Sequence, residues 1–160
     1  MKKLISIIIP MYNEEESLPY LYDRLTKLAD KIENYNMEFL FVNDGSKDNS
    51  LNIVKEYKKS DERVCYLNLS RNFGKEVAMA AALDYVRGDV VAIIDADLQD
   101  PPELIIDMLK YYEEGYDDVY AKRKSRKGET ILKKFTSHTF YRVLRSVSKV
   151  PIQEDTGDFR

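Results

Sequence analysis

Short apolar runs alternate with amphipathic segments along the first 121 residues of the chain. The runs are rich in Ile, Val, Leu and Phe, show little polar alternation, and occupy residues 4–9, 38–42, 64–69 and 90–94. Runs of this kind are typical of parallel strands that are buried on both faces. Apolar residues at steps of three and four follow each run and predict a helix after each strand. A short fifth strand is expected over 118–121.

Caps, prolines and glycines mark the predicted helix boundaries. Ser17, with a proline two residues later, is expected to cap the first helix. Asp100 is expected to cap the fourth, with two prolines in the first turn and Glu103 at the third helical position. Gly88 and Gly115 are expected to end the third and fourth helices.

Strands that alternate with helices predict an α/β fold, with a mostly parallel, doubly wound sheet and helices on both of its faces. Ligands bind such sheets beyond the carboxyl ends of the strands. Polar clusters follow the four predicted strands, at 12–16, 43–50, 70–75 and 95–100. We therefore expect these clusters to converge on one crevice.

Asp95 and Asp97 come directly after the fourth run. On a strand-like backbone the two side chains point the same way, because side chains repeat every second residue. Two like charges aimed together are unfavourable unless a cation lies between them. A divalent metal that holds a phosphate fits this need, because hard cations take oxygen ligands.

Composition indicates one globular domain, with 44% hydrophobic and 33% charged residues. The only cysteine, Cys65, lies in an apolar run and is expected in the core, and the only histidine, His138, is expected to be structural. One residue of each type excludes an internal disulfide and a Cys/His metal cluster. No run reaches the roughly 18 apolar residues of a membrane-spanning helix, and no signal peptide is expected.

Charge is unevenly distributed along the chain. Residues 122–149 contain ten Lys or Arg and one Glu, a net charge of +9. Because the whole chain has a net charge of −3, the remaining residues carry −12. We therefore expect an α/β core over 1–121 and, over 122–160 of the same domain, a basic loop followed by an amphipathic helix. The helix could lie in a membrane interface or pack on its own domain, and periodicity leaves both open. The acidic body argues against nucleic-acid binding.

Five motifs occur together and in order. They are Ile9-Pro10-Met11-Tyr12-Asn13-Glu14-Glu15, Val42-Asn43-Asp44-Gly45-Ser46, Leu69-Ser70-Arg71-Asn72-Phe73-Gly74-Lys75, Asp95-Ala96-Asp97-Leu98-Gln99-Asp100-Pro101-Pro102-Glu103 and Gly157-Asp158-Phe159-Arg160. The chain resembles family 2 glycosyltransferases over nearly its whole length. Within them it is most similar to the polyisoprenyl-phosphate glycosyltransferases, the dolichol-phosphate mannose synthases and bactoprenol glucosyltransferases.

The resemblance implies a GT-A fold and an inverting transfer of a hexose from a UDP- or GDP-sugar to a polyisoprenyl (undecaprenyl or dolichyl) phosphate. It implies Mg²⁺ or Mn²⁺ as cofactor, with Asp95, Asp97 and Gln99 at the metal and diphosphate. It places the nucleotide sugar at Pro10, Tyr12, Glu14, Asp44, Lys75 and Asp95. Arg123 and Arg126 fall where the family places cations for the acceptor phosphate. Asp97 would act in catalysis through the metal, and Asp158 is the candidate base, with Asp155 in reserve.

Two positions depart from the family pattern. Asn43 stands where many relatives have a second Asp, which removes one carboxylate near the nucleotide. Asp100 stands where the mannose synthases tend to have His, which favours the bacterial lipid glycosyltransferases. The resemblance also implies C-terminal membrane helices that this sequence does not include, so we expect a truncated domain from the cytoplasmic face of the membrane. The fragment is expected to bind the donor and do little more, and homo-oligomerisation stays open.

Two other functions compete with this one. In the first, the same fold and donor serve a saccharide hydroxyl acceptor, and Asp158 must then act as a base. In the second, the chain is a non-catalytic module that binds a membrane surface through its basic helix. A phosphohydrolase that uses Asp95 and Asp97 is less favoured, because nothing else indicates a phospho-aspartate.

Overall fold

A computed structural model describes residues 2–121 and 159 of the chain. Four parallel strands form one sheet in the order β3-β2-β1-β4: β1 (Lys3–Met11), β2 (Tyr35–Asn43), β3 (Val64–Asn68) and β4 (Val90–Ile93). The helices are α1 (Leu18–Lys31), α2 (Ser50–Ser60), α3 (Lys75–Leu83) and α4 (Leu104–Glu113). The predicted α/β class and parallel sheet are confirmed. Apart from Tyr120 and Ala121, the described residues belong to one compact unit.

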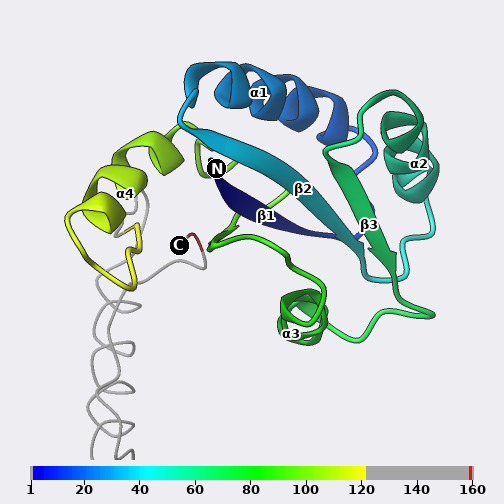
Figure 1. The fold of residues 1–160 in the computed structure, drawn as a ribbon. Helices are drawn as coiled ribbons and strands as arrows, with labels where there is room; N and C mark the ends of the chain where they lie inside the picture. Colours follow the sequence, from blue (N-terminus) through cyan, green and yellow to red (C-terminus); the bar gives the residue numbers. More distant parts are fainter. Residues whose placement is uncertain (1, 122–158, 160) are drawn as a thin grey trace, which may run out of the picture. The chain divides into compact units, whose positions relative to one another are not determined.

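The strand order shows where the chain changes its direction of winding. From β1 it proceeds outward through β2 to β3, and it then crosses back to place β4 on the other side of β1. Figure 1 shows the result: α1 and α2 cover one face of the sheet and α3 covers the other. The switch point lies between β1 and β4, and the crevice beyond their carboxyl ends is where doubly wound sheets bind ligands.

The core lies on the two central strands and the helices that cover them. Ile7 and Ile9 of β1 and Phe39 and Phe41 of β2 are fully buried. The predicted stripe of α1 is confirmed, with buried leucines at positions 18, 21, 25 and 28. These residues form a rigid base from which the loops at the carboxyl edge project.

β1 extends beyond the apolar run at residues 4–9 and includes Pro10. β1 continues to Met11, and Pro10 pairs with Val42 of β2. The backbone N–H and C=O groups of residues two apart point to the same neighbouring strand. The carbonyl of Ile8 accepts a hydrogen bond from Ile94 after β4, so the backbone nitrogen of Pro10 also faces the β4 side. Because the β4 ladder ends at Ile8, no strand hydrogen bond is lost to the missing N–H.

β4 is less buried than its sequence predicted. Only Ala92 of this strand is buried, while Val90, Val91 and Ile93 are partly exposed. Within the described residues β4 pairs with β1 alone, so its other edge has no ladder. The fifth strand expected over 118–121 is also wrong, because this segment pairs with no strand in the described part of the chain.

One predicted glycine stop is confirmed and the other is wrong. Gly115, at φ +100°, follows α4, and the N–H groups of Gly115 and Tyr116 donate to the carbonyls of Tyr112 and Tyr111, a Schellman ending. α3 ends at Leu83, five residues before Gly88. A Cβ at Gly88 would lie 2.6 Å from the backbone nitrogen of Ser6, so this glycine permits close approach to β1 instead.

The two predicted N-caps also differ from expectation. α4 begins at Leu104, later than expected, and Glu103 rather than Asp100 occupies the cap position. The Glu103 carboxylate pairs with Arg24 of α1, whose hydrogen bond holds the pKa of Glu103 below its usual value. Ser17 does precede α1, but its hydroxyl donates to the Glu14 carboxylate at 2.7 Å and makes no side-chain cap bond.

A buried carboxylate joins β1 and β2 to the segment before β4. Glu38 is 3% exposed; it accepts hydrogen bonds from the Ser6 hydroxyl at 2.6 Å and from Arg87 Nε at 2.8 Å. Burial alone would raise the pKa of Glu38, but the hydrogen bonds from Ser6 and Arg87 outweigh it, and the pKa is lowered. The charged form of Glu38 therefore stabilises the folded state at neutral pH, and this contribution is lost at acidic pH.

Arg87→Ala tests this buried pair. It should lower the free energy of unfolding by about 1–3 kcal/mol at neutral pH, because a buried carboxylate loses its charged partner. Lys59→Ala, which breaks an exposed pair with Glu56, is the control and should cost about 0.5 kcal/mol or less. Urea unfolding at several pH values measures both.

The pH dependence of the Arg87→Ala effect has a definite sign. Because the pKa of Glu38 is lowered in the folded state, its contribution is present above the unfolded pKa and is lost as the pH falls through the folded one. The difference between wild type and Arg87→Ala should therefore shrink below about pH 4. An equal difference at pH 3 and pH 7 would contradict the assignment.

Candidate functional site

The loops after the strands enclose a crevice of about 400 Å³ at the carboxyl edge of the sheet. We call it the carboxyl-edge crevice; it is lined by Pro10, Met11, Tyr12, Glu14, Asp44, Asn72, Gly74, Lys75, Asp95, Ala96 and Asp97. Segments that follow all four strands contribute to it. The structure thus brings together seven of the residues that the sequence analysis selected: 10, 12, 14, 44, 75, 95 and 97. Their individual roles stay predictions.

The loop after β1 is held by the loop after β2. Asn13 has a left-handed backbone, φ +57°, and its N–H donates to the Ser46 hydroxyl at 3.0 Å. The N–H of Lys47 donates back to the Asn13 side-chain carbonyl at 2.8 Å, and the N–H of Glu14 donates to the Ser50 hydroxyl at 2.8 Å. Because these bonds cross between loops, the positions of Tyr12 and Glu14 depend on residues more than 30 positions away.

Asp44 fixes the loop that precedes α3. Its side chain is buried, and its two oxygens accept hydrogen bonds from the N–H groups of Phe73, at 2.7 Å, and Gly74, at 2.9 Å. Gly45 beside it has φ +68°, and a Cβ there would lie 2.5 Å from the backbone carbonyl carbon of Arg71. The sequence analysis gave Asp44 to the nucleotide, and the structure adds a positioning role within the protein itself.

Asn43, the family departure next to Asp44, has a structural role in this chain. Its side-chain amide donates to the Asn68 side-chain carbonyl at 2.7 Å, and its own carbonyl oxygen accepts the N–H of Ser46 at 3.2 Å. Asn43 is buried, 2% exposed. A carboxylate there could not donate to Asn68, so the amide suits this position.

The acidic end of the crevice follows β4. The strand ends at Ile93, and the chain turns at 96–97, so the strand-like backbone expected for Asp95 and Asp97 is wrong. Leu98 has φ +61°, and the N–H of Gln99 donates to the Asp97 carboxylate at 3.0 Å. Both carboxylates nevertheless line the same crevice.

Gln99, the predicted third metal ligand, does not line the carboxyl-edge crevice, and its side chain is exposed. Asp97 lines the carboxyl-edge crevice and also a second polar hollow, which it shares with Glu14, Glu15 and Asp48, among others. Asp97 therefore stands between two acidic surfaces.

Lys75 supplies the cation beside the acidic pair in this structure. It is the first residue of α3, and its Nζ lies 2.5 Å from an oxygen of Asp95. Both side chains are about one third exposed, 34% for Lys75 and 32% for Asp95. The sequence analysis expected a cation near Asp95 and also expected Lys75 near the nucleotide, but it did not pair the two residues.

The donor set of the crevice fits a divalent metal only in part. Among the described residues no group of three His, Cys, Asp or Glu could hold a metal ion. Two carboxylates do suit Mg²⁺ or Mn²⁺ when phosphate oxygens and water supply the other ligands. The residues therefore fit a metal that enters with a diphosphate rather than a closed metal site.

Several predicted features lie outside the described residues. They are the acceptor residues Arg123 and Arg126, the candidate bases Asp158 and Asp155, the basic helix and His138. The boundary between 1–121 and 122–160 stays a prediction. Phe159 of the last motif is described and is 3% exposed.

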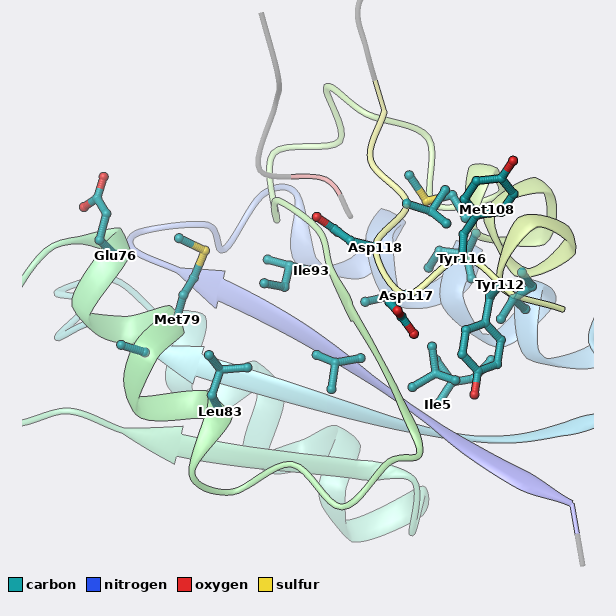
Figure 2. A pocket seen from close by; sticks show the side chains of 17 residues that line it. Ile5, Glu76, Met79, Leu83, Ile93, Met108, Tyr112, Tyr116, Asp117 and Asp118 are labelled. Carbon is teal, nitrogen blue, oxygen red and sulfur yellow. The ribbon is translucent and has the colours of Figure 1, made fainter. Parts of the chain in front are cut away.

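A separate apolar hollow of about 480 Å³ lies beside β4. Figure 2 shows Met79 and Leu83 of α3 on one side of it, and Met108 and Tyr112 of α4 on the other, with Ile93 between. It is better enclosed by apolar side chains than the carboxyl-edge crevice is. It contains few groups suited to chemistry on a phosphate, however, so the crevice is the candidate site.

Comparison with known families identifies the chain. The sequence profile of Glycosyl transferase family 2 matches residues 6–159. The chain belongs to this family. The resemblance stated from the motifs is confirmed, and the chain is a glycosyltransferase domain.

Individual relatives refine the comparison. The chain is 50% identical over 155 residues to an uncharacterized glycosyltransferase, YkcC, of Bacillus subtilis, covering 97% of this chain and 48% of that protein. It is 40% identical over 156 residues to a prophage bactoprenol glucosyl transferase homolog of Escherichia coli, covering 98% of this chain and 51% of the relative. The chain thus spans about half the length of these relatives.

A solved structure shows the same fold. Staphylococcus aureus TarS in complex with UDP-GlcNAc superposes with a TM-score of 0.62 at 28% identity, covering 82% of this chain and 37% of that one. With the parallel sheet, this neighbour identifies the fold as GT-A, as the resemblance implied.

Gly45→Ala tests whether the two loops need their close approach. Gly115→Ala is the matched control, because it also has positive φ but a Cβ there would meet nothing within 4 Å. Because of the left-handed backbone alone, Gly115→Ala should lower the free energy of unfolding by about 1–2 kcal/mol. Gly45→Ala should cost about 1–3 kcal/mol more, because the methyl group collides with the backbone of Arg71. Equal losses in chemical unfolding would contradict this account.

Proposed function

We propose that the chain provides the donor-binding part of a metal-dependent, inverting glycosyltransferase. The enzyme moves a hexose from a UDP- or GDP-sugar to a polyisoprenyl phosphate. The observation that carries the proposal is the crevice itself, where seven of the predicted residues, from segments at the carboxyl ends of all four strands, meet at the switch point of the sheet. Relatives named bactoprenol glucosyl transferase support the lipid acceptor, and the TarS complex with UDP-GlcNAc supports a nucleotide-sugar donor.

The two ends of the crevice have different chemistry. Pro10, Tyr12 and Glu14 offer apolar, aromatic and hydrogen-bonding surface, which suits a nucleoside. Asp95 and Asp97, with Lys75 beside them, gather the charged groups that a diphosphate requires. We therefore orient the donor with its nucleoside toward the β1 loop and its diphosphate toward the residues after β4.

The reaction is a single displacement. An oxygen of the acceptor phosphate attacks the anomeric carbon as the bond from that carbon to the nucleotide diphosphate breaks, and the configuration inverts. A divalent ion held by Asp95 and Asp97 would neutralise the charge that develops on the leaving diphosphate. Lys75 adds a positive charge at the same end.

The acceptor side needs positioning more than proton removal. A phosphate monoester is already an anion at neutral pH, so Arg123 and Arg126 would orient it and offset its charge. Asp158 is the candidate base where a proton must be removed. A hydroxyl acceptor would depend on such a base, and this dependence separates the alternative from the favoured acceptor.

Membrane association belongs to the proposal because the acceptor is a lipid. None of the described helices is long and apolar enough to span a bilayer. The basic residues of 122–149 are suited to the anionic cytoplasmic leaflet. We place the enzyme on the cytoplasmic face, where nucleotide sugars and the lipid phosphate meet.

Asp97→Ala tests the donor site. UDP, GDP, UDP-glucose and GDP-mannose are titrated calorimetrically with and without Mn²⁺. Wild type should bind one nucleotide family more tightly with Mn²⁺, and Asp97→Ala should lose about tenfold or more of that affinity. Asp107→Ala, an exposed carboxylate on α4, is the control and should bind as wild type does. Unchanged affinity in a folded Asp97→Ala protein would contradict the metal assignment.

The double variant Arg123→Ala/Arg126→Ala tests the acceptor. In an enzyme that spans the length of the relatives, in vesicles that contain undecaprenyl phosphate, the double variant should lose the transfer to the lipid that wild type shows while it keeps nucleotide affinity, because both cations are assigned to the acceptor phosphate. Radiolabelled sugar in the lipid phase is the readout. Full transfer to the lipid would overturn the assignment, and retained transfer to a saccharide hydroxyl alone would favour the alternative acceptor.

A further inference from the structure

The pair Lys75–Asp95 occupies the place where the proposed function needs a metal. Asp95 is one of the two carboxylates assigned to the cation, and the Lys75 ammonium lies 2.5 Å from its oxygen. An ammonium and a divalent cation compete for the same carboxylate oxygen and repel each other. The metal can therefore take this oxygen of Asp95 only when Lys75 leaves it.

The Lys75 side chain can change partner while the backbone before it stays in position. The backbone just before it is held in place, because the N–H groups of Phe73 and Gly74 donate to Asp44. The side chain itself is a flexible four-carbon stem that lines the open crevice. Both partners are about one third exposed. Ion pairs of this kind contribute little free energy, so losing this one should change the binding constant of a competing cation by about fivefold or less.

A diphosphate supplies the alternative partner. It brings negative charge to the same end of the crevice, and an ammonium is a good counter-ion for phosphate. We propose that Lys75 is an exchangeable counter-ion: it pairs with Asp95 before the donor binds and would pass to the diphosphate when the donor and metal bind together. The inference rests on the proposed function and deepens it.

This exchange makes metal and nucleotide binding cooperative. Without nucleotide, Lys75 opposes the cation at Asp95, so the metal binds weakly. With nucleotide, the same side chain is drawn to the phosphates, and Asp95 is released to the metal. A ligand without a diphosphate would not draw Lys75 away, so the pair selects for ligands that carry a diphosphate.

The test measures two affinities whose changes have opposite signs. Binding of Mn²⁺ alone is followed by the loss of its free-ion paramagnetic resonance signal, and binding of UDP and GDP at saturating Mn²⁺ by calorimetry. Lys75→Ala should bind Mn²⁺ alone up to about fivefold more tightly, because the competing ammonium is gone. It should bind the preferred nucleotide with Mn²⁺ about tenfold more weakly, because the diphosphate loses its counter-ion. A merely structural lysine would not tighten Mn²⁺ binding.

Matched variants separate local exchange from general charge effects. Lys47→Ala removes the same charge from the neighbouring acidic hollow, beside Asp97, and should tighten Mn²⁺ binding less than Lys75→Ala does. Lys75→Arg keeps a cation and should behave closer to wild type. Lys75→Met keeps the aliphatic stem and should repeat the result of Lys75→Ala.

The outcomes distinguish this inference from the proposed function. Unchanged or weaker Mn²⁺ binding in both Lys75→Ala and Lys75→Met overturns the exchange, while metal-dependent nucleotide binding by wild type still supports the donor site. Equal tightening by Lys47→Ala also overturns it. If wild type binds neither UDP nor GDP with Mn²⁺, the proposed function and the exchange both fail.

Discussion

The carboxylate of Asp44 is the contact on which the candidate site depends. It lies at the end of a fully buried stretch of β2 and accepts two backbone hydrogen bonds from the loop before α3. That loop leads directly into Lys75, which reaches Asp95 after β4. One buried side chain thus fixes a chain of contacts from the second strand to the fourth. Without it, the loop before α3 would lose its two side-chain hydrogen bonds to the end of β2.

The architecture explains why this support has to cross between loops. Parallel strands bring their carboxyl ends to one edge, but each loop leaves in the direction of its own helix. The loops after β1 and β2 therefore exchange hydrogen bonds through Asn13, Ser46 and Ser50, and the loop after β3 is held by Asp44. Short polar side chains are suited to such bonds, which accounts for the turn-forming residues after each strand.

The sequence predicted the strands and the crevice well because both follow from periodicity and topology. The largely apolar runs at 4–9 and 38–42 lie in the two central strands, and the leucines of α1 form its buried face. The polar clusters converged because parallel topology requires it. These properties depend on the pattern along the chain and little on individual contacts.

The failures have a common origin in contacts between residues that are distant in sequence. Gly88 resembles a helix stop, but its role is to let β1 approach, which only the packed structure reveals. Asp100 resembles a capping residue, but α4 begins later, at Leu104, and the carboxylate of the residue at the cap position, Glu103, binds Arg24 of α1. Residues 118–121 have the composition of a strand but lack a partner in the described part of the chain. The pairing of Lys75 with Asp95 likewise depends on topology rather than on spacing.

Two ion pairs in this unit show how structure separates stability from function. Glu38 is almost fully buried and receives hydrogen bonds from Ser6 and Arg87 as well as the charge of Arg87, so breaking the pair leaves a buried carboxylate without a charged partner. Asp95 is one third exposed and faces an open crevice, where water or a ligand can replace Lys75. The first arrangement resists exchange and stabilises the sheet away from the crevice. The second is open to exchange at the edge where the donor is proposed to bind, so its charges can be redistributed without loss of the fold.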